Sequence, residues 1–497
     1  MVDRLSLMVV QNYYTSSNLE AVSMFRYWKA AARYCKDDIN VIISFPRGRD
    51  KERFAKTGFY EDSDDAMRRL CSDNFNFVRC ARSAEDLYPE MMFSPINEDE
   101  ANLLMHRNIK TFDIDMVVMR YGIAVDAVPL MFTNATQFRS SYRPAVVSFF
   151  TETGLDESLF GLNTYNAKWR FVIDAIMSDA WLTFNKIDTD WVLKFARDNV
   201  SDAVYMSIKK KSKIVKPIGS IDEIDEARIK FSYEEKRKKA LDDGKIVIYC
   251  SGGAEKKRNW DYVFDFLDAY YDLGGKNMSA LFCTPSSTLK SDRVEERLHV
   301  ESRINHNKDE YYASLSEATI GFAGSRYEGT GFGMIEHAYS GLLMVYLYYD
   351  WMNGRILNNY PFVAKDKREL FEIFTQLSVP KDVKKYREEW CPKLIEFYSR
   401  FGKPAAVELC QTLKDILKEH IDKTSESEVL LWDVVKKVKK NEFTSIDEFY
   451  EEVGRLCDVP KDAKTVKALM SPIGARFLLR KNGYFEDSGR WVKVRGE

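Results

Sequence analysis

The sequence lacks the residue patterns of metal-binding and disulfide-stabilised proteins. Its eight cysteines are scattered, without a single C-x-x-C pair, and its five histidines include no H-E-x-x-H motif. A disulfide framework and a zinc centre are therefore not expected, and no motif in the chain requires a metal. Unpaired cysteines are typical of a reducing compartment, so we expect a cytoplasmic protein.

The chain also lacks a long apolar run and an excess of charge of either sign. No stretch approaches the roughly 18 apolar residues of a membrane span, and the apolar core of the N-terminal segment is too short for a signal peptide. Lysine and arginine total 74 against 76 for aspartate and glutamate, so the net charge is −2 and nucleic-acid binding would need a local patch. What remains is the composition of a globular protein, 45% apolar and 30% charged, long enough for about two to four domains.

Two successive sets of alternating strand and helix patterns predict two α/β lobes. The first set has β-rich runs at residues 5–11, 39–45, 114–122 and 144–154. The second set has them at residues 245–253, 278–284, 319–324 and 342–349. Alternation of this kind favours parallel sheets with crossover helices, and ligands then bind at the carboxyl ends of the strands.

Boundaries between the predicted parts follow from turn residues and charge. A Pro-Ile-Gly-Ser turn at residues 217–220 precedes a dense charge run and predicts a hinge, although a charged surface helix explains the run equally well. We therefore predict lobes at residues 1–218 and 219–420, with a cleft between them. Residues 421–497 form a mainly helical extension, which could be winged-helix-like because a turn at residues 481–489 leads into a short terminal strand.

A run of alternate glycines, Gly329, Gly331 and Gly333, lies between a strand pattern and a helical segment. Its spacing is neither the G-x-G-x-x-G of dinucleotide-binding turns nor that of a P-loop. A strand, a glycine turn and a helix still gather backbone N–H groups at the positive end of the helix, which suits a diphosphate. Glu328 and Glu336 bracket the turn and can accept hydrogen bonds from sugar and ribose hydroxyls. Taken alone, each glutamate is better explained structurally, as a turn carboxylate or a favourable helix charge, whereas the pair together with the glycines and the preceding strand favours a functional role.

The segment SRYEGTGFGMIEHAYSG resembles the E-x7-E signature of retaining, nucleotide-sugar-dependent glycosyltransferases with the two-Rossmann GT-B architecture. In that family the second carboxylate binds the ribose of the donor and the first contacts the donor sugar. The resemblance therefore implies that Glu336 binds the ribose of the donor, and that Glu328 contacts the donor sugar and is catalytic. It also implies that Gly331, Phe332 and Gly333 bring backbone amides to a donor such as UDP-glucose, which is a co-substrate rather than a cofactor.

A basic run near the start of the second lobe resembles the diphosphate site of the family. Family members carry an Arg at the end of the strand and a Lys shortly after it, both on the diphosphate. Here Lys256, Lys257 and Arg258 all lie near the Lys position, while the Arg position falls on Gly253 or Ser251. Which basic residue binds the diphosphate stays open, and a solvated charge run before a helix explains the pattern equally well.

In the first lobe the resemblance concerns the architecture. It makes residues 1–218 the acceptor-side lobe and residues 219–420 the nucleotide-sugar-binding lobe. The end of the strand at residues 144–154 would border the acceptor, so Glu152 is a second candidate catalytic residue. The loop after the first strand lacks the usual Gly-Gly pair and one diphosphate-binding Arg is missing, which favours an alternative: a non-catalytic, nucleic-acid-binding scaffold with the same fold. A sugar-nucleotide epimerase of the same double-lobed shape is a further alternative.

The C-terminal residues carry a local positive charge. From Lys461 to Glu497 there are nine Lys or Arg and four Asp or Glu, a net charge of +5. The candidate nucleic-acid contacts are Lys464, Lys467, Arg476, Arg480 and Lys481. An acceptor consisting of hydroxymethylated DNA bases, as in viral DNA-modifying glycosyltransferases, is therefore one hypothesis. A saccharide acceptor, with the tail as a helical cap whose basic face is solvated, is the other.

Overall fold

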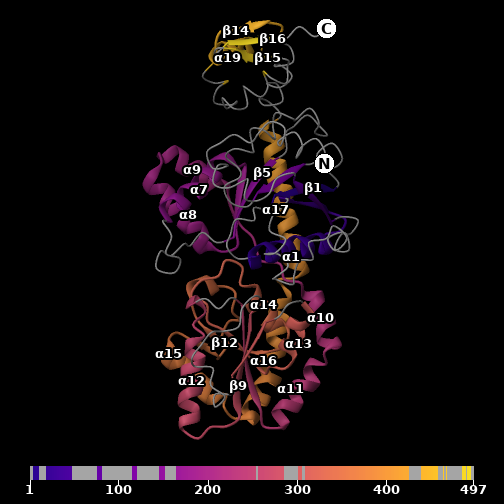
Figure 1. The fold of residues 1–497 in the computed structure, drawn as a ribbon, viewed down its shortest axis with the longest axis vertical. Coiled ribbons are helices and arrows are strands. Elements are labelled where there is room, and N and C mark those ends of the chain that lie inside the picture. Colours follow the sequence, from indigo (N-terminus) through magenta and orange to yellow (C-terminus); the bar gives the residue numbers. More distant parts are fainter. Residues whose placement is uncertain are drawn as a thin grey trace.

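The computed structural model describes residues 4–10, 18–46, 75–80, 115–119, 145–151, 164–252, 256–284, 300–304, 308–424 and 438–456, together with Ala463, Val466, Leu479 and residues 484–487 and 490–493. They form two large parallel sheets and one small antiparallel sheet (Figure 1). Among these residues, none of the helices combines the length and the apolar character that crossing a bilayer requires.

The first sheet contains seven parallel strands in the order β3-β2-β1-β4-β5-β6-β7. Its strands are β1 (Leu5–Val10), β2 (Ile39–Pro46), β3 (Phe75–Cys80), β4 (Met116–Met119), β5 (Ala145–Phe150), β6 (Ala180–Thr183) and β7 (Ser212–Ile214). The helices described in this lobe are α1 (Asn18–Tyr34), α7 (Thr164–Met177), α8 (Lys186–Asn199) and α9 (Asp202–Lys211). Strands β4, β5 and β6 are buried along their full length, as expected of a parallel sheet covered on both faces.

The second sheet contains six parallel strands in the order β10-β9-β8-β11-β12-β13. Its strands are β8 (Ile246–Ser251), β9 (Met278–Thr284), β10 (Val300–Ile304), β11 (Ile320–Ala323), β12 (Leu343–Leu347) and β13 (Val363–Ala364). The α-helices of this lobe are α10 (Ile221–Lys230), α11 (Tyr233–Asp242), α12 (Asp261–Asp272), α13 (Lys308–Ser316), α14 (Phe332–Tyr339), α15 (Lys367–Gln376) and α16 (Pro380–Ser399). Two short 3-10 helices, η3 (Lys256–Arg258) and η5 (Asp350–Met352), follow β8 and β12.

The prediction of two Rossmann-like α/β lobes is confirmed by these sheets. Each of the eight β-rich runs found in the sequence overlaps one strand of the structure, and only β2 extends beyond its run, by one residue. In the two large sheets, strands β3, β6, β7, β10 and β13 were not predicted from the sequence. The boundaries predicted after residues 218 and 420 stay predictions.

Each lobe has its own apolar core, and the last long helix belongs to the first of them. The core of the second lobe includes Phe401, shortly after α16. Helix α17 (Lys403–Thr424) then packs Leu409 and Leu413 into the core of the first lobe, and Figure 1 shows it beside β5. The chain therefore returns to the first lobe after completing the second, which the sequence pattern did not reveal.

The C-terminal extension contains a three-stranded antiparallel sheet as well as helix. Strands β14 (Glu442–Phe443), β15 (Tyr484–Asp487) and β16 (Arg490–Lys493) pair in the order β14-β16-β15, and α19 (Ile446–Leu456) packs on them. The turn predicted at residues 481–489 is therefore wrong in part, because β15 occupies its middle. The reason is burial: Tyr484 lies in a core with Trp491, which a solvated turn could not provide.

Candidate functional site

The glycine turn joins β11 to α14 at the carboxyl edge of the second sheet. Helix α14 begins at Phe332, with Gly331 as its N-cap at a φ of 65°. A Cβ at Gly331 would lie 2.8 Å from the Trp351 ring, so both the backbone angle and the available space require glycine. A Cβ at Gly333 would meet only Ser251 Oγ, at 3.7 Å. The first turn of α14 therefore lies beside the end of β8.

Glu328 lies in this turn and forms an ion pair with Arg258 of η3. Arg258 also donates to Ser325 Oγ at 3.2 Å. Burial alone would raise the pKa of the Glu328 carboxyl, but the positive charges of Arg258 and Lys257 outweigh it, so this pKa lies below its ordinary value. Gly252, at a φ of 126°, leaves room for the guanidinium group of Arg258, which a Cβ would approach to 2.7 Å. The structure thus brings Arg258, one of the predicted basic residues, to the first carboxylate, and the charge of Lys257 acts on the same carboxyl.

Glu336 lies on α14 and faces the first lobe. It is 4% exposed, and it accepts hydrogen bonds from Arg26 Nη2 of α1 at 2.6 Å and from the Tyr311 hydroxyl of α13 at 2.8 Å. Burial acts to lower the pKa of Arg26, but the negative charge of Glu336 outweighs it, so the pKa is raised and the guanidinium stays charged. Arg26 also lies 3.4 Å from the Tyr312 hydroxyl and 4.0 Å from the Glu223 carboxylate. The second signature carboxylate is therefore held by a cation from the other lobe.

A serine and a histidine are hydrogen-bonded to each other beside the first turn of α14. Ser251, the last residue of β8, and His337 of α14 are hydrogen-bonded through Oγ and Nε2 at 2.7 Å. Burial, reinforced by the charges of Arg258 and Arg237, lowers the pKa of His337 to about 3. The imidazole is therefore neutral at pH 7. Its Nδ1 has no hydrogen-bond partner among the residues that the structure describes.

The carbonyl side of the glycine turn faces Arg355, which lies shortly after η5. Arg355 is 4% exposed and donates to Thr330 O at 2.9 Å and to Gly329 O at 3.1 Å. It also donates to Phe184 O of the first lobe at 2.9 Å, and Asn185 Nδ2 lies 3.4 Å from Gly329 O. Residues of both lobes therefore hold the turn.

Sequence reasoning did not assign Arg26, His337 or Arg355 to the site. Arg26 carries no local signal, because it lies 310 positions from Glu336 in the chain. Arg355 lies outside the signature and contacts only its backbone carbonyls, which no residue pattern records. His337 directly follows Glu336, so its place on a short buried helix was the one available signal.

Several predicted site residues lie outside the described part of the chain. They are Glu152, Gly253, Lys464, Lys467, Arg476, Arg480 and Lys481, and the side chain of Lys256 is not described either. The roles predicted for them stay predictions. Within the described ranges, no group of three or more His, Cys, Asp or Glu residues could hold a metal ion.

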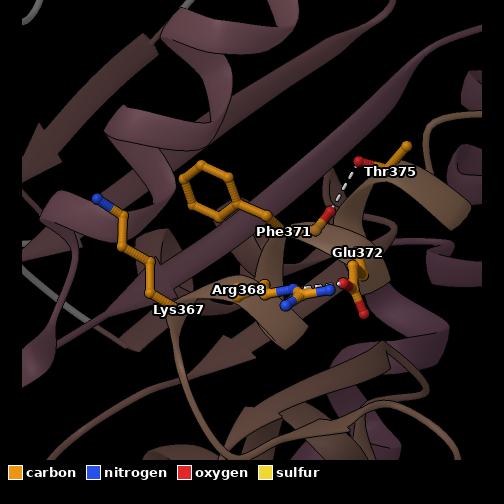
Figure 2. Close-up of a pocket in the computed structure, with 5 residues that line it drawn as sticks. All are labelled: Lys367, Arg368, Phe371, Glu372 and Thr375. Carbon is orange, nitrogen blue, oxygen red and sulfur yellow. Dashed lines mark hydrogen bonds and ion pairs between the residues drawn. The ribbon is translucent and has the colours of Figure 1, made fainter.

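A surface groove of about 680 Å³ lies along α15 and is lined by Lys367, Arg368, Phe371, Glu372 and Thr375 (Figure 2). Its polar side chains are already bonded: Lys367 to Asp265 at 2.6 Å, Arg368 to Glu372 at 3.1 Å, and Thr375 to the Phe371 carbonyl at 2.7 Å. The lining includes none of the predicted donor-site residues. We therefore place the candidate site at the glycine turn and not in this groove.

Known structures with the same two-lobed arrangement span most of this chain. The α,α-trehalose-phosphate synthase (UDP-forming) of Burkholderia vietnamiensis superposes with a TM-score of 0.55 at 11% identity, over 85% of this chain and 100% of that chain. The catalytic domain of starch synthase IV from Arabidopsis thaliana, bound to ADP and acarbose, gives 0.54 at 10% identity, over 84% and 99%. HepE from Anabaena, in complex with UDP and glucose, gives 0.51 at 9% identity, over 84% and 100%.

These likenesses show the fold: the chain has the GT-B arrangement of two Rossmann-like lobes. No protein-family profile matches the chain, and no curated protein matches it by sequence.

Proposed function

We propose that this chain is a retaining glycosyltransferase, which moves a hexosyl group from a nucleoside-diphosphate sugar to an acceptor hydroxyl. The observation that carries the proposal is the placement of Glu328 and Glu336 on either side of the glycine turn, with Arg258 on the first carboxylate. The turn lies at the carboxyl edge of a parallel sheet, where open α/β sheets bind their ligands. Structures of the same fold that contain UDP or ADP support this choice of donor.

In the proposed reaction, residues of the second lobe hold both ends of the donor. The ribose hydroxyls would donate to Glu336 and the sugar hydroxyls to Glu328, because ionised carboxylates are acceptors only. The first N–H groups of α14 and the guanidinium of Arg258 would face the diphosphate. They stabilise the negative charge that grows as the glycosidic bond breaks, which lowers the barrier to an oxocarbenium-like state. Retention requires the acceptor hydroxyl to attack from the face that the leaving group departs, and Glu152 stays the candidate on the acceptor side.

Donor binding at Glu336 requires a rearrangement, because Arg26 and Tyr311 already bond its two oxygens. A ribose would have to replace the bond from Arg26, the partner that belongs to the other lobe. Movement of α1 away from α14 would open the carboxylate, and closure over the bound donor would exclude water from the reaction. We therefore propose that the lobes separate to admit the donor.

A panel of nucleotide sugars, beginning with UDP-glucose, tests the proposal through release of the nucleoside diphosphate. We expect turnover by the wild-type chain, loss of UDP binding in Glu336→Gln, and retained UDP binding with about 100-fold slower release of UDP from UDP-glucose in Glu328→Gln. Glu317→Gln is the matched control, because Glu317 forms a half-exposed ion pair with Arg303 at 2.9 Å. A wild-type chain that binds no nucleotide sugar would favour the scaffold hypothesis instead.

For the acceptor, we propose DNA that carries hydroxymethylated bases. The support is the net charge of +5 over residues 461–497 and a small antiparallel sheet with an edge hairpin, an arrangement that suits the predicted winged-helix-like module. A saccharide acceptor remains the second candidate. DNA binding through phosphates weakens steeply with salt, because bound cations are released from the duplex.

Charge reversal in the full-length chain separates the two acceptors. In Lys464→Glu/Lys467→Glu we expect duplex affinity to fall and the slope of affinity against salt to become shallower by about two charges. Turnover with water or a simple saccharide should not change. Unaltered DNA affinity in this variant, or no salt dependence in the wild-type chain, would leave the saccharide as the acceptor. The anomeric configuration of the product, read by NMR, decides between retention and inversion.

A further inference from the structure

Arg355 grips the glycine turn by its backbone rather than by its side chains. The guanidinium donates to the carbonyls of two successive residues, Gly329 and Thr330, and to the carbonyl of Phe184 in the first lobe. Its face lies over the Trp351 ring, with 5.6 Å between the guanidinium carbon and the ring centroid. Three carbonyls and one aromatic face therefore surround this side chain.

This geometry determines the direction of the turn's N–H groups. A peptide unit is planar, and its C=O and N–H groups point in opposite directions. Once Arg355 fixes the carbonyls of Gly329 and Thr330, the N–H groups of Thr330 and Gly331 must point to the opposite side of the turn. Arg355 thus orients the backbone between Glu328 and the start of α14 without approaching a ligand itself.

The first lobe holds the same turn at three further points. Asn185, the N-cap of α8, lies with its Nδ2 3.4 Å from Gly329 O. The Tyr327 hydroxyl, just before the turn, donates to the buried carboxylate of Asp188. The Phe332 ring packs against the core of the first lobe, with its centroid 6.5 Å from that of Phe184. The conformation of the turn therefore depends on the position of the first lobe.

The charge of Arg355 is maintained although it is buried. Burial lowers its pKa to about 10, and the negative charge of Asp188 opposes that effect. The guanidinium is therefore protonated at pH 7. Lysine would keep the charge, but it cannot reproduce a planar fork that reaches three carbonyls from one position.

We infer that Arg355 is a positioning residue for the proposed transfer reaction, which ties the turn that carries Glu328 to the β6–α8 loop of the first lobe. The turn then reaches its reactive shape only when the two lobes are together. This inference rests on the proposed function. Its structural part, the control of the turn by Arg355, can be measured without any donor.

The test compares Arg355→Lys with Arg237→Lys. Arg237 is fully buried in the same lobe and likewise donates to three carbonyls, those of Leu315, Ala318 and Ser340, at 3.0, 2.9 and 2.6 Å. Both substitutions remove the same kind of contact. Of the two arginines, Arg355 bonds the glycine turn and Arg237 does not, among the contacts of the described residues. We measure unfolding midpoints, amide hydrogen exchange in peptides that cover residues 184–188 and 327–335, UDP affinity, and the rate of UDP release from UDP-glucose.

We expect both variants to be less stable than the wild type, whereas only Arg355→Lys exchanges faster at residues 327–335. Per folded molecule, Arg355→Lys should release UDP about 100-fold more slowly, because a small displacement of a reacting group has effects of that size. Its affinity for UDP should change by less than about threefold, since Glu336 lies on α14 and not in the turn. Arg237→Lys should keep the wild-type rate per folded molecule.

A second variant applies if Arg355→Lys does not fold. Asn185→Ser removes the amide beside Gly329 but keeps a good cap for α8, and it should also raise exchange at residues 327–335. Equal exchange in the turn for the two arginine variants and the wild type, or equal rates per folded molecule, would overturn the inference. If the wild-type chain binds no nucleotide sugar, the proposed function fails, and the exchange comparison still decides whether Arg355 controls the turn.

Discussion

Arg258 and Arg26 hold the two signature carboxylates, and they come from different lobes. Arg258 lies in the same lobe as Glu328, so their ion pair survives any separation of the lobes. Arg26 lies on α1, so its bond to Glu336 exists only while the lobes are in contact. The proposed sugar-binding carboxylate is therefore always neutralised, whereas the proposed ribose-binding carboxylate changes its partner with lobe position.

His337 gives the site a measurable pH dependence. Its pKa of about 3 in the folded protein lies below the ordinary 6.5, chiefly because of burial. Below pH 6.5 His337 is protonated in the unfolded chain but stays neutral in the folded protein. The free energy of unfolding therefore falls as the pH falls, by up to about 1.4 kcal/mol per pH unit. From pH 7 to pH 5.5 we expect the free energy of unfolding to fall by about 1 kcal/mol more in the wild type than in His337→Gln. Urea unfolding of both proteins at the two pH values measures it.

Comparison of the two proteins removes the contribution of other titrating groups. Glutamine can still bond Ser251, which limits the cost of the substitution itself. Parallel stability curves for His337→Gln and the wild type would contradict the prediction, because they would mean that His337 titrates alike in both states.

The sequence pattern predicted that Glu328 and Glu336 flank the glycine turn, but not which side chains bond them. Glu328 and Glu336 could be identified because a strand, a fixed turn length and a helix determine their placement locally. Arg26 and Arg355 could not, because their contacts depend on how distant segments pack. A basic run at residues 256–258 predicted a cation near the turn, but the space that Gly252 leaves for the guanidinium of Arg258 could not be read from the sequence.

At the level of elements, α14 and the turn before it allow stability and donor binding to be separated. Gly331→Ala should destabilise the protein by at least about 2 kcal/mol, because alanine is strained at a φ of 65° and its Cβ meets Trp351 at 2.8 Å. Gly333→Ala should leave stability unchanged or raise it by up to about 1 kcal/mol, since alanine favours a helix. It should nevertheless weaken UDP binding about tenfold, because the added methyl group, 3.7 Å from Ser251 Oγ, would occupy space beside the first turn of α14.

Urea unfolding and calorimetric titration with UDP measure the two effects. Undiminished UDP affinity in Gly333→Ala would show that the diphosphate does not approach the N-terminus of α14. A Gly331→Ala variant as stable as the wild type would mean that the turn can change shape freely.

The sequence predicted the central strands and missed short or polar ones. Strand β9 matches its apolar run at both ends, because a buried parallel strand is a nearly continuous apolar segment. Strand β10 lies at the sheet edge and contains Glu301 and Arg303, so its pattern resembles a loop. Strands β6 and β7 are too short for a sequence pattern to reveal them. They form because neighbouring strands offer backbone groups to pair with.

For the whole molecule, the bond between Arg26 and Glu336 should oppose opening of the lobes. We expect Arg26→Ala to lose about 2–3 kcal/mol of stability at pH 7, because in the closed form the buried carboxylate of Glu336 loses its cation and keeps the bond from Tyr311. The variant should also have a larger radius of gyration in small-angle X-ray scattering. It should bind UDP about tenfold more tightly, because the ribose no longer competes with a guanidinium.

Arg33→Ala is the matched control for this prediction. Arg33 also lies on α1 and reaches across to α10, but its ion pair with Asp222, at 3.2 Å, is half-exposed and should contribute less than about 1 kcal/mol. UDP affinity that falls in Arg26→Ala while it is unchanged in Arg33→Ala would mean that Arg26 assists the donor rather than excludes it.

The return of α17 to the first lobe restricts how the two lobes can move. The chain passes between them twice, near Gly219 and near Phe401, and the two passages are joined by a hydrogen bond from Gly219 N to Phe401 O at 2.8 Å. Two adjacent chain crossings allow the lobes to rotate as about a hinge. They resist twisting of one lobe relative to the other, because twisting would pull the two crossings apart. The motion then has a single dominant degree of freedom. One rotation between the lobes would then break both the bond from Arg26 to Glu336 and the contacts of Phe184 with Arg355 and Phe332.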